Sequence, residues 1–313
     1  MSDFAFVFPG QGSQAVGMLD AWGEHPAVIE TLAEASDALG EDIKLLIHAG
    51  PKEALDQTTN TQPAMLTAGV ACYRAWLRET GLRPTVVAGH SLGEYSALVA
   101  ADSLSLADAL PLVRFRAQAM QEAVPVGVGA MAAVLGIDAQ AVRLACADAA
   151  RICGEVVEVA NFNDPRQTVI AGTKGGVAAA CELVKTRGAK RALLLPVSAP
   201  FHSSLMRPAA ERLKERLVDV ALRPPAIPMI NNIDVAKPTD ADAIRDALYR
   251  QAYGVVRWVE VIQAIRASGV CMILECGPGK VLSAMVKRIV ADASSVCVSD
   301  PASMAEARSL VAA

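Results

Sequence analysis

The pentapeptide Gly-His-Ser-Leu-Gly at residues 89–93 has the G-x-S-x-G spacing of a nucleophile elbow. In such a turn, two glycines let the chain bend sharply from a strand into a helix, and backbone amides at the helix N-terminus face the serine hydroxyl. An uncharged, β-branched segment precedes the motif, and a helical pattern follows it to about residue 101. This context predicts that Ser91 is a nucleophile. The alternative is an ordinary strand–helix loop in which the serine is an N-cap.

A serine nucleophile needs a general base within hydrogen-bonding reach, and the chain has four histidines. His25 and His48 lie in polar, helix-rich sequence, and His90 lies inside the elbow, where consecutive side chains point apart. His202 follows a predicted buried strand at residues 192–197, which suits a loop at a strand end. By elimination His202 is the candidate base. Because no acidic residue is evident beside it, a Ser–His dyad is expected.

The order of these residues disfavours a simple esterase. In α/β-hydrolases the catalytic histidine comes late, after the acid. Here no histidine follows His202, and the last third of the chain lies beyond it.

An oxyanion hole needs two backbone donors aimed at the developing charge. The amide of Leu92, directly after the candidate nucleophile, is the natural first donor. The second is expected from the glycine-rich loop at residues 9–14, which follows a predicted strand at residues 4–8 and has Gln11 at its centre. The loop matches neither G-x-G-x-x-G nor a P-loop, so nucleotide binding is disfavoured.

The elements around these residues predict an α/β protein with an insertion. Residues 129–197 read as strand, helix, two strands, helix and strand, which is the ferredoxin-like order. We therefore expect a hydrolase-like large domain with a parallel sheet, made of residues 1–125 and 199–313. A ferredoxin-like (βαββαβ) small subdomain is expected at residues 126–198.

Composition narrows the class of protein. Of 313 residues, 53% are hydrophobic, and the formal net charge is −4, from 29 basic and 33 acidic residues. A disordered chain and an electrostatic nucleic-acid binder are therefore disfavoured. The longest uncharged stretches, residues 4–19 and 57–73, are too short and too polar for a membrane span, and the N-terminus is unlike a secretory signal. Seven cysteines without a C-x-x-C pair predict free thiols in a cytoplasmic protein, and no metal site is expected.

With these residues assembled, the sequence resembles the malonyl-CoA:acyl carrier protein transacylases, the acyltransferases of fatty acid synthesis. The similar segments run almost from end to end and in order. They are residues 8–14, 61–64, 89–97, Arg116 with Met120 and Gln121, 161–163, 200–202, Asn231 with Asn232, Gln251, and 277–280. The family's fold, a hydrolase-like domain interrupted by a ferredoxin-like subdomain, agrees with the predicted order of elements.

The resemblance implies a role for individual residues. It implies that Ser91 is the nucleophile and His202 the general acid and base. The amides of Gln11 and Leu92 would be the oxyanion donors, and Arg116 would bind the malonyl carboxylate. Gln251 would orient His202 through its backbone carbonyl, and Gln62 would line the pocket.

Selectivity for malonyl is expected from Arg116 and Phe201. Arg116 makes chemical sense, because malonyl carries a carboxylate that acetyl lacks and a guanidinium binds carboxylates with a planar fork. Its neighbour Arg114 fits a solvated helix residue better. In related polyketide acyltransferases, a phenylalanine before the base accompanies malonyl selection, and Phe201 stands at that place, although some family members have serine there.

The resemblance implies transfer of malonyl from malonyl-CoA to the phosphopantetheine thiol of acyl carrier protein through a malonyl-serine ester. No cofactor or metal is expected. The expected partners are acyl carrier protein and malonyl-CoA, without nucleic acid or membrane, and a monomer is expected. Three alternatives stay open: a discrete acyltransferase serving a polyketide synthase, a serine thioesterase or other hydrolase, and a non-enzymatic docking module.

Overall fold

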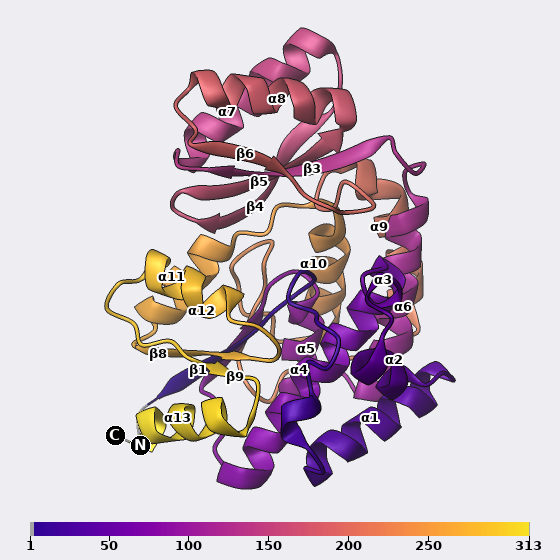
Figure 1. Cartoon of the computed structure of the whole chain (residues 1–313), viewed down its shortest axis with the longest axis vertical. Coiled ribbons are helices and arrows are strands. Elements are labelled where there is room, and N and C mark those ends of the chain that lie inside the picture. The colour runs from indigo at the N-terminus through magenta and orange to yellow at the C-terminus, as the bar shows by residue number, and fades with distance from the viewer. Residues whose placement is uncertain (1–2, 313) are drawn as a thin grey trace.

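A computed structural model of the chain describes residues 3–312, which form two lobes, each with its own sheet (Figure 1). The large lobe begins with β1 (Phe4–Phe8), α1 (Pro26–Leu39), α2 (Ile43–Ala49), α3 (Lys52–Leu55), α4 (Thr58–Thr80), β2 (Val86–Gly89), α5 (Gly93–Ala100) and α6 (Leu106–Glu122). The small lobe consists of β3 (Gly129–Leu135), α7 (Ala139–Cys153), β4 (Val157–Asp164), β5 (Gln167–Thr173), α8 (Lys174–Thr186) and β6 (Arg191–Leu194). The chain then completes the large lobe with α9 (Arg207–Val218), β7 (Met229–Ile230), α10 (Ala241–Tyr253), α11 (Trp258–Ala267), β8 (Met272–Cys276), α12 (Val281–Ile289), β9 (Cys297–Val298) and α13 (Pro301–Ala312), and short 3-10 helices occupy Asp20–Trp22 and Ser204–Met206.

The sheet of the large lobe is parallel throughout, with the strand order β7-β2-β1-β8-β9. Parallel strands bring their carboxyl ends to the same edge, and open α/β sheets bind ligands at that edge. The loops that follow β1, β2, β7 and β8 therefore meet there, although they come from distant parts of the chain.

Strand β1 is buried on both faces, which explains its uninterrupted apolar sequence. Its three phenylalanines point toward α4, where the rings of Phe6 and Trp76 meet edge to face with centroids 5.4 Å apart. Ala5 and Val7 point to the opposite face and belong to the core formed with α11 and α12. Helices thus cover both sides of the strand from which the glycine-rich loop emerges.

The small lobe has an antiparallel sheet with the order β4-β5-β3-β6, the strand order of a ferredoxin-like fold. Helices α7 and α8 cover the face that is remote from the large lobe (Figure 1). Met131 and Val169 point to the other face and join the core of the large lobe. The small lobe therefore covers the carboxyl edge of the large sheet.

Backbone hydrogen bonds connect the two lobes. The amide of Phe162 donates to the carbonyl of Val256 at 2.9 Å, and the amide of Val256 donates to Ala160 at 2.9 Å. Arg288 also binds the buried carboxylate of Asp164 at 2.7 Å. Strand β4 is thus joined to the large lobe by direct hydrogen bonds and an ion pair.

The predicted fold class is confirmed, and the differences lie at element ends. Strand β6 ends at Leu194 rather than at residue 197, because Pro196 has no N–H for the ladder. The two-residue strands β7 and β9 were not predicted, since such short segments carry too little periodicity. All four strands of the small sheet fall within the predicted 126–198 segment. Across residues 3–312, every helix is too short or too polar to cross a bilayer.

Candidate active site

The turn around Ser91 connects β2 to α5 and holds the serine in the left-handed region, with φ of 52°. The turn is so tight that a Cβ atom on Gly89 would lie 1.9 Å from the carbonyl carbon of Gly93. Asn232, from the loop after β7, secures the turn. Its side chain accepts a hydrogen bond from the Ser91 amide at 2.7 Å and donates to the Gly89 carbonyl at 2.7 Å. Backbone geometry therefore presents the hydroxyl at the carboxyl edge of the sheet.

His202 lies beside this hydroxyl. The distance from its Nε2 to Ser91 Oγ is 2.7 Å, and its Nδ1 lies 2.9 Å from the carbonyl of Gln251 and 3.2 Å from that of Gly254. The two carbonyls accept hydrogen bonds, so Nδ1 carries the proton and Nε2 is free to accept one from the serine.

The orientation of His202 comes from a helix end. Helix α10 finishes at Tyr253, so the Gln251 carbonyl is among the last four, which have no partner within the helix. These carbonyls are also the negative end of the helix dipole, which favours a positive charge on the ring during catalysis. A helix terminus thus takes the place that a carboxylate has in a triad.

The environment of His202 keeps its ring neutral. Burial and, after it, the positive charge of Arg116 lower the pKa of His202 from 6.5 to about 3. A base must be unprotonated to accept a proton, so this ring is ready to do so at neutral pH.

Arg116 is a buried cation whose hydrogen-bond acceptors in the described part of the chain are all uncharged. Its guanidinium donates to Gln62 Oε1 at 2.8 Å, to Gln251 Oε1 at 3.0 Å and to Ser91 Oγ at 3.3 Å. Within residues 3–312 no carboxylate lies within 4.0 Å of it, and its Nε has no hydrogen-bond partner. Arg114, two positions earlier, instead pairs with Glu41. Burial lowers the pKa of the Arg116 guanidinium, but an arginine stays charged, so the site is prepared for an anion.

A second buried charge lies beneath the elbow. The Glu94 side chain is completely buried, and its Oε2 accepts hydrogen bonds from Gln251 Nε2 and from the Asn232 amide, both at 3.0 Å. The same Gln251 Nε2 donates to the Ser91 carbonyl at 2.9 Å. Burial raises the pKa of Glu94 to about 7. Gln251 therefore links the nucleophile, the buried arginine and this carboxylate.

The loop after β1 approaches the elbow closely. A Cβ atom on Gly10 would lie 2.6 Å from the carbonyl oxygen of His90 and 3.7 Å from the amide of Leu92. The amides of Gln11 and Leu92 donate to no acceptor in the described part of the chain. Both predicted oxyanion donors thus have a free N–H beside the same site.

These groups line a cavity of about 170 Å³ between the lobes. Its lining consists of Gln11, Gln62, His90, Ser91, Leu92, Arg116, Met120, Met131, Asn161, Asn163, Val169, Leu195, Val197, Phe201 and His202. The polar groups come from the large lobe and from β4, and apolar side chains of the small lobe cover them. No cluster of three or more metal-binding side chains occurs between residues 3 and 312.

Comparison with known proteins identifies the family to which this chain belongs. The model of the acyl transferase domain family matches residues 5–307. The chain belongs to the acyl transferase family. Among its curated relatives is the malonyl CoA-acyl carrier protein transacylase of Escherichia coli (strain K12), 51% identical over 99% of this chain and 100% of that protein.

Solved acyl transferase structures agree over the whole length. The acyl-carrier-protein S-malonyltransferase of Burkholderia pseudomallei 1710b has a TM-score of 0.96 and 61% identity, and the match covers 97% of this chain and 99% of that one. A malonyl-transacylase solved in complex with its type II PKS acyl-carrier protein has a TM-score of 0.95 and 48% identity, with 98% and 99% covered. The family suggested by the sequence is thereby confirmed.

The structure brings together all the predicted site residues of this acyl transferase fold. Seven of the eight line the cavity, and Gln251 lies directly behind it. Sequence reasoning gave no role to Glu94 or Asn232. Glu94 had a usable signal, because it is the single charge in the otherwise uncharged α5. Asn232 gave no such signal in the sequence, because the backbone groups of Ser91 and Gly89 that it binds are 141 and 143 residues away.

His90 is a packing residue, as its place directly before Ser91 in the elbow predicts. Its Nε2 lies 2.8 Å from Asn163 Oδ1, and its ring meets Trp258 edge to face. Burial lowers the pKa of His90, so this ring is neutral. The ring packs between the elbow and the small lobe. Among residues 3–312, no hydrogen bond joins it to the Ser91 hydroxyl.

Proposed function

We propose that this protein transfers a malonyl group from malonyl-CoA to the phosphopantetheine thiol of an acyl carrier protein, through an ester on Ser91. The observation that carries the proposal is the buried guanidinium of Arg116, which lies 3.3 Å from Ser91 Oγ and has no carboxylate within 4.0 Å among residues 3–312. The carboxylate of a malonyl ester lies two bonds beyond the carbonyl carbon, so it can reach this cation. Acetyl would leave the charge uncompensated.

Acylation uses the Ser91–His202 pair. His202 Nε2 takes the hydroxyl proton as Oγ attacks the thioester carbonyl carbon, and the resulting oxyanion accepts hydrogen bonds from the amides of Gln11 and Leu92. Collapse of the tetrahedral intermediate breaks the C–S bond. The CoA sulfur leaves with the proton that His202 received, and the ring returns to its neutral form.

Transfer to the carrier repeats these steps in reverse. His202 takes the proton of the phosphopantetheine thiol, and the sulfur attacks the ester carbonyl of malonyl-Ser91. The Ser91 oxygen leaves and recovers the proton from His202. Each half-reaction is balanced in protons, and its steps use only side chains and backbone amides of this chain.

Binding of malonyl also prepares the base. After burial, the charge of Arg116 is the second cause of the low pKa of His202. A bound carboxylate offsets that charge, so the pKa of His202 rises toward the range in which proton transfer in both directions is efficient. Malonyl thus assists its own transfer, and acetyl does not.

The acceptor class is supported by relatives whose names state an acyl carrier protein. Fatty acid synthesis is the proposed pathway, and service to a polyketide synthase is the alternative, because one similar structure contains a type II PKS carrier. Rates with a carrier from each pathway, compared at equal concentration, separate the two. A cytoplasmic location and a monomeric state stay predictions from the sequence.

The proposal is tested by mixing the protein with malonyl-CoA and a phosphopantetheinylated carrier protein and measuring the intact mass of the carrier over time. We expect a malonyl-carrier product and little free malonate. Rapid release of malonate that the carrier does not diminish would instead identify a thioesterase. If neither malonyl-carrier nor free malonate forms, both functions are refuted.

A further inference from the structure

Two separate elements support the Ser91–His202 pair. Asn232, in the loop after β7, holds the turn that carries Ser91 through hydrogen bonds of 2.7 Å to the Ser91 amide and the Gly89 carbonyl. Gln251, in the last turn of α10, holds His202 through its carbonyl at 2.9 Å. The distance between nucleophile and base therefore depends on how the loop and the helix are placed relative to each other.

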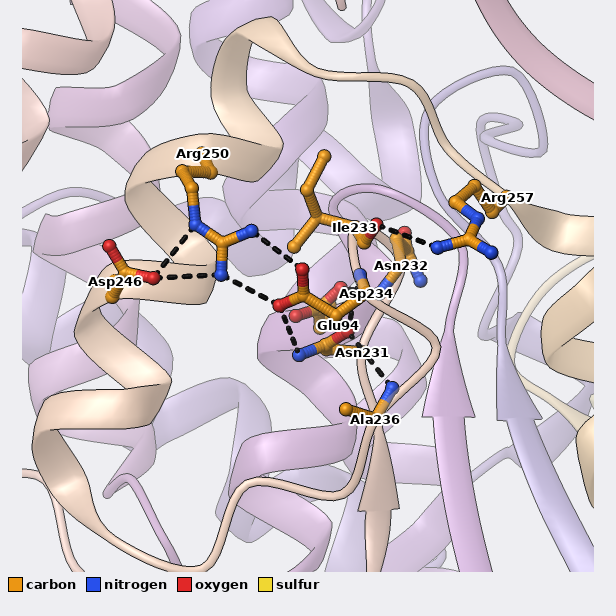
Figure 2. A network of polar contacts seen from close by, with 9 residues as sticks. All are labelled: Glu94, Asn231, Asn232, Ile233, Asp234, Ala236, Asp246, Arg250 and Arg257. Carbon is orange, nitrogen blue, oxygen red and sulfur yellow. Dashed lines mark hydrogen bonds and ion pairs between the residues drawn. The ribbon is translucent and has the colours of Figure 1, made fainter.

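An ion pair joins these two elements, as Figure 2 shows. Arg250, the residue before Gln251, donates to both carboxylate oxygens of Asp234, at 2.6 and 2.7 Å. Asp234 lies two residues after Asn232. Such a two-pronged pair fixes orientation as well as distance. The Arg250 guanidinium is itself held by Asp246, one helical turn earlier in α10, at 2.7 Å.

The loop needs an external restraint. Val235 has a φ of 58°, a strained conformation for a β-branched residue. Asn231 shapes the turn from within, by accepting a hydrogen bond from the Asp234 amide at 2.9 Å. This bond shapes the loop locally, but it does not tie it to α10. Inside the fold, Glu94 Oε2 links the two elements by accepting hydrogen bonds from the Asn232 amide and from Gln251 Nε2. The Asp234–Arg250 ion pair connects them directly, from outside the cavity.

We propose that the Asp234–Arg250 ion pair is a positioning clamp that sets the geometry of the Ser91–His202 pair from outside the cavity. The inference rests on the proposed function only in taking these two residues as nucleophile and base. Neither clamp residue touches the cavity, so both are positioning residues. Because a misplacement of about 1 Å can lower a rate by about 100-fold, a small loosening of this clamp is enough to slow acylation.

The pair is charged at neutral pH and partly open to solvent. Hydrogen bonds from Arg250 lower the pKa of the Asp234 carboxyl, and those to Asp234 raise the pKa of Arg250. The two side chains are 38% and 32% exposed. Exposed ion pairs contribute little to the stability of a fold. Loss of the pair should therefore change the reaction rate much more than the melting temperature.

The test compares Arg250→Ala and Asp234→Ala with Arg266→Ala. The last is a matched control, since Arg266 is 33% exposed and paired with Asp292 away from the cavity. The rate constant of malonyl-enzyme formation is measured by rapid quench and intact mass at saturating malonyl-CoA, together with the half-saturating concentration and the melting temperature. We expect the rate constant to fall about tenfold in both clamp variants. Half-saturation should change less than about twofold, and the control should match the wild type.

Two further variants separate positioning from general damage. Arg250→Lys keeps the charge without the fork and should recover part of the lost rate. Asp246→Ala removes the neighbour that does not reach the loop and should cost less than about twofold. A wild-type rate in Arg250→Ala, or an equal loss in Arg266→Ala, would overturn the clamp. So would a rate loss that tracks only the folded fraction.

A fluorophosphonate label keeps this test independent of malonyl recognition, because it reports the reactivity of Ser91 alone. We expect labelling of the two clamp variants to slow about tenfold as well. If the wild type reacts with the label but forms no malonyl adduct, the proposed function fails while the clamp is still judged by the labelling rates. If malonyl transfer proceeds and the clamp variants react at wild-type rates with both reagents, only the clamp fails.

Discussion

The turn that carries Ser91 and the loop that carries His202 solve the same problem by different means. Both residues have positive φ, 52° and 60°, and both are held in place by hydrogen bonds. The Ser91 turn is shaped mostly by its own sequence, through its glycines and the strand and helix on either side. The His202 ring is oriented by carbonyls 49 and 52 residues away. The nucleophile is a local structure, whereas the base is a product of the tertiary fold.

The largest effect should come from removing His202, the member of the Ser91–His202 pair that is oriented by distant residues. Of the two side chains within hydrogen-bonding distance of Ser91 Oγ among residues 3–312, His202 and Arg116, only His202 can accept its proton. In His202→Ala, acylation and transfer to the carrier should therefore both slow by about 100- to 10,000-fold. Rapid-quench measurement of each half-reaction checks this. His48→Ala, an exposed histidine paired with Asp20, is the control. If only one half-reaction slowed, a second base would have to act in the other.

Arg116→Ala tests the anion site that lies between the two loops. Its loss removes charge-assisted hydrogen bonds of roughly 1.5–3 kcal/mol each, so malonyl transfer should fall by about 100-fold or more. Acetyl transfer has no such bond to lose and should fall far less. The measurement is kcat/KM for malonyl-CoA and acetyl-CoA with the same carrier. Equal losses for the two acyl groups would remove Arg116 from its role in selectivity.

Asn232→Ala removes two of the distant hydrogen bonds that support the Ser91 turn. The part-buried Ser91 amide and the buried Gly89 carbonyl then lose these hydrogen bonds, which should lower the free energy of unfolding by about 1–3 kcal/mol and slow acylation as well. Urea denaturation and rapid quench measure the two effects. Ser295→Ala removes a buried bond to the Ile273 carbonyl elsewhere in the sheet and should affect stability alone. An unchanged acylation rate in Asn232→Ala would show that the turn is held by its own sequence.

The smallest expected effect is on the pH profile. With the pKa of His202 lowered to about 3 before substrate binds, the ring of the free enzyme stays neutral from pH 8 to pH 5. The value of kcat/KM for acylation, which reports the free enzyme, should therefore change less than about twofold. An unperturbed histidine of pKa 6.5 would lose about 30-fold at pH 5. A malonyl-pantetheine thioester is the substrate of choice, because it lacks the phosphates of CoA, which titrate near 6.

Glu94 needs a control in this profile, since burial raises its pKa to about 7. Glu94→Gln removes that titration while it preserves the shape of the side chain. An inflection present in the wild type and absent from Glu94→Gln belongs to Glu94. An inflection near pH 6.5 that persists in the variant would contradict the low pKa of His202.

What the sequence could predict follows the same division between local and distant support. The elbow, the glycine-rich loop and the βαββαβ order all depend on neighbouring residues, and each was recognised in its own stretch of sequence. His202 was reached only by elimination, because nothing near it specifies its partner at the end of α10. The roles of Arg116, Gln62 and Gln251 came from resemblance to a family, since the hydrogen bonds from Arg116 to the two glutamines span 54 and 135 residues.

Asn232 and Glu94 went unassigned for a related reason. An asparagine after a two-residue strand looks like any turn residue, and its importance lies in which backbone atoms it reaches. Glu94 is a buried carboxylate whose hydrogen bonds come from two other segments of the chain. Periodicity describes which face of an element is buried, but it does not show which polar groups meet inside the fold.

One measurement tests the central claim most directly: peptide mapping of the protein after brief mixing with malonyl-CoA, in the wild type and in Ser91→Ala. We expect the mass of one malonyl group on the peptide that contains Ser91, released when a phosphopantetheine thiol is added, and no adduct in the variant. A malonyl group on a different residue, or an adduct that persists in Ser91→Ala, would contradict the assignment of the nucleophile and the mechanism built on it.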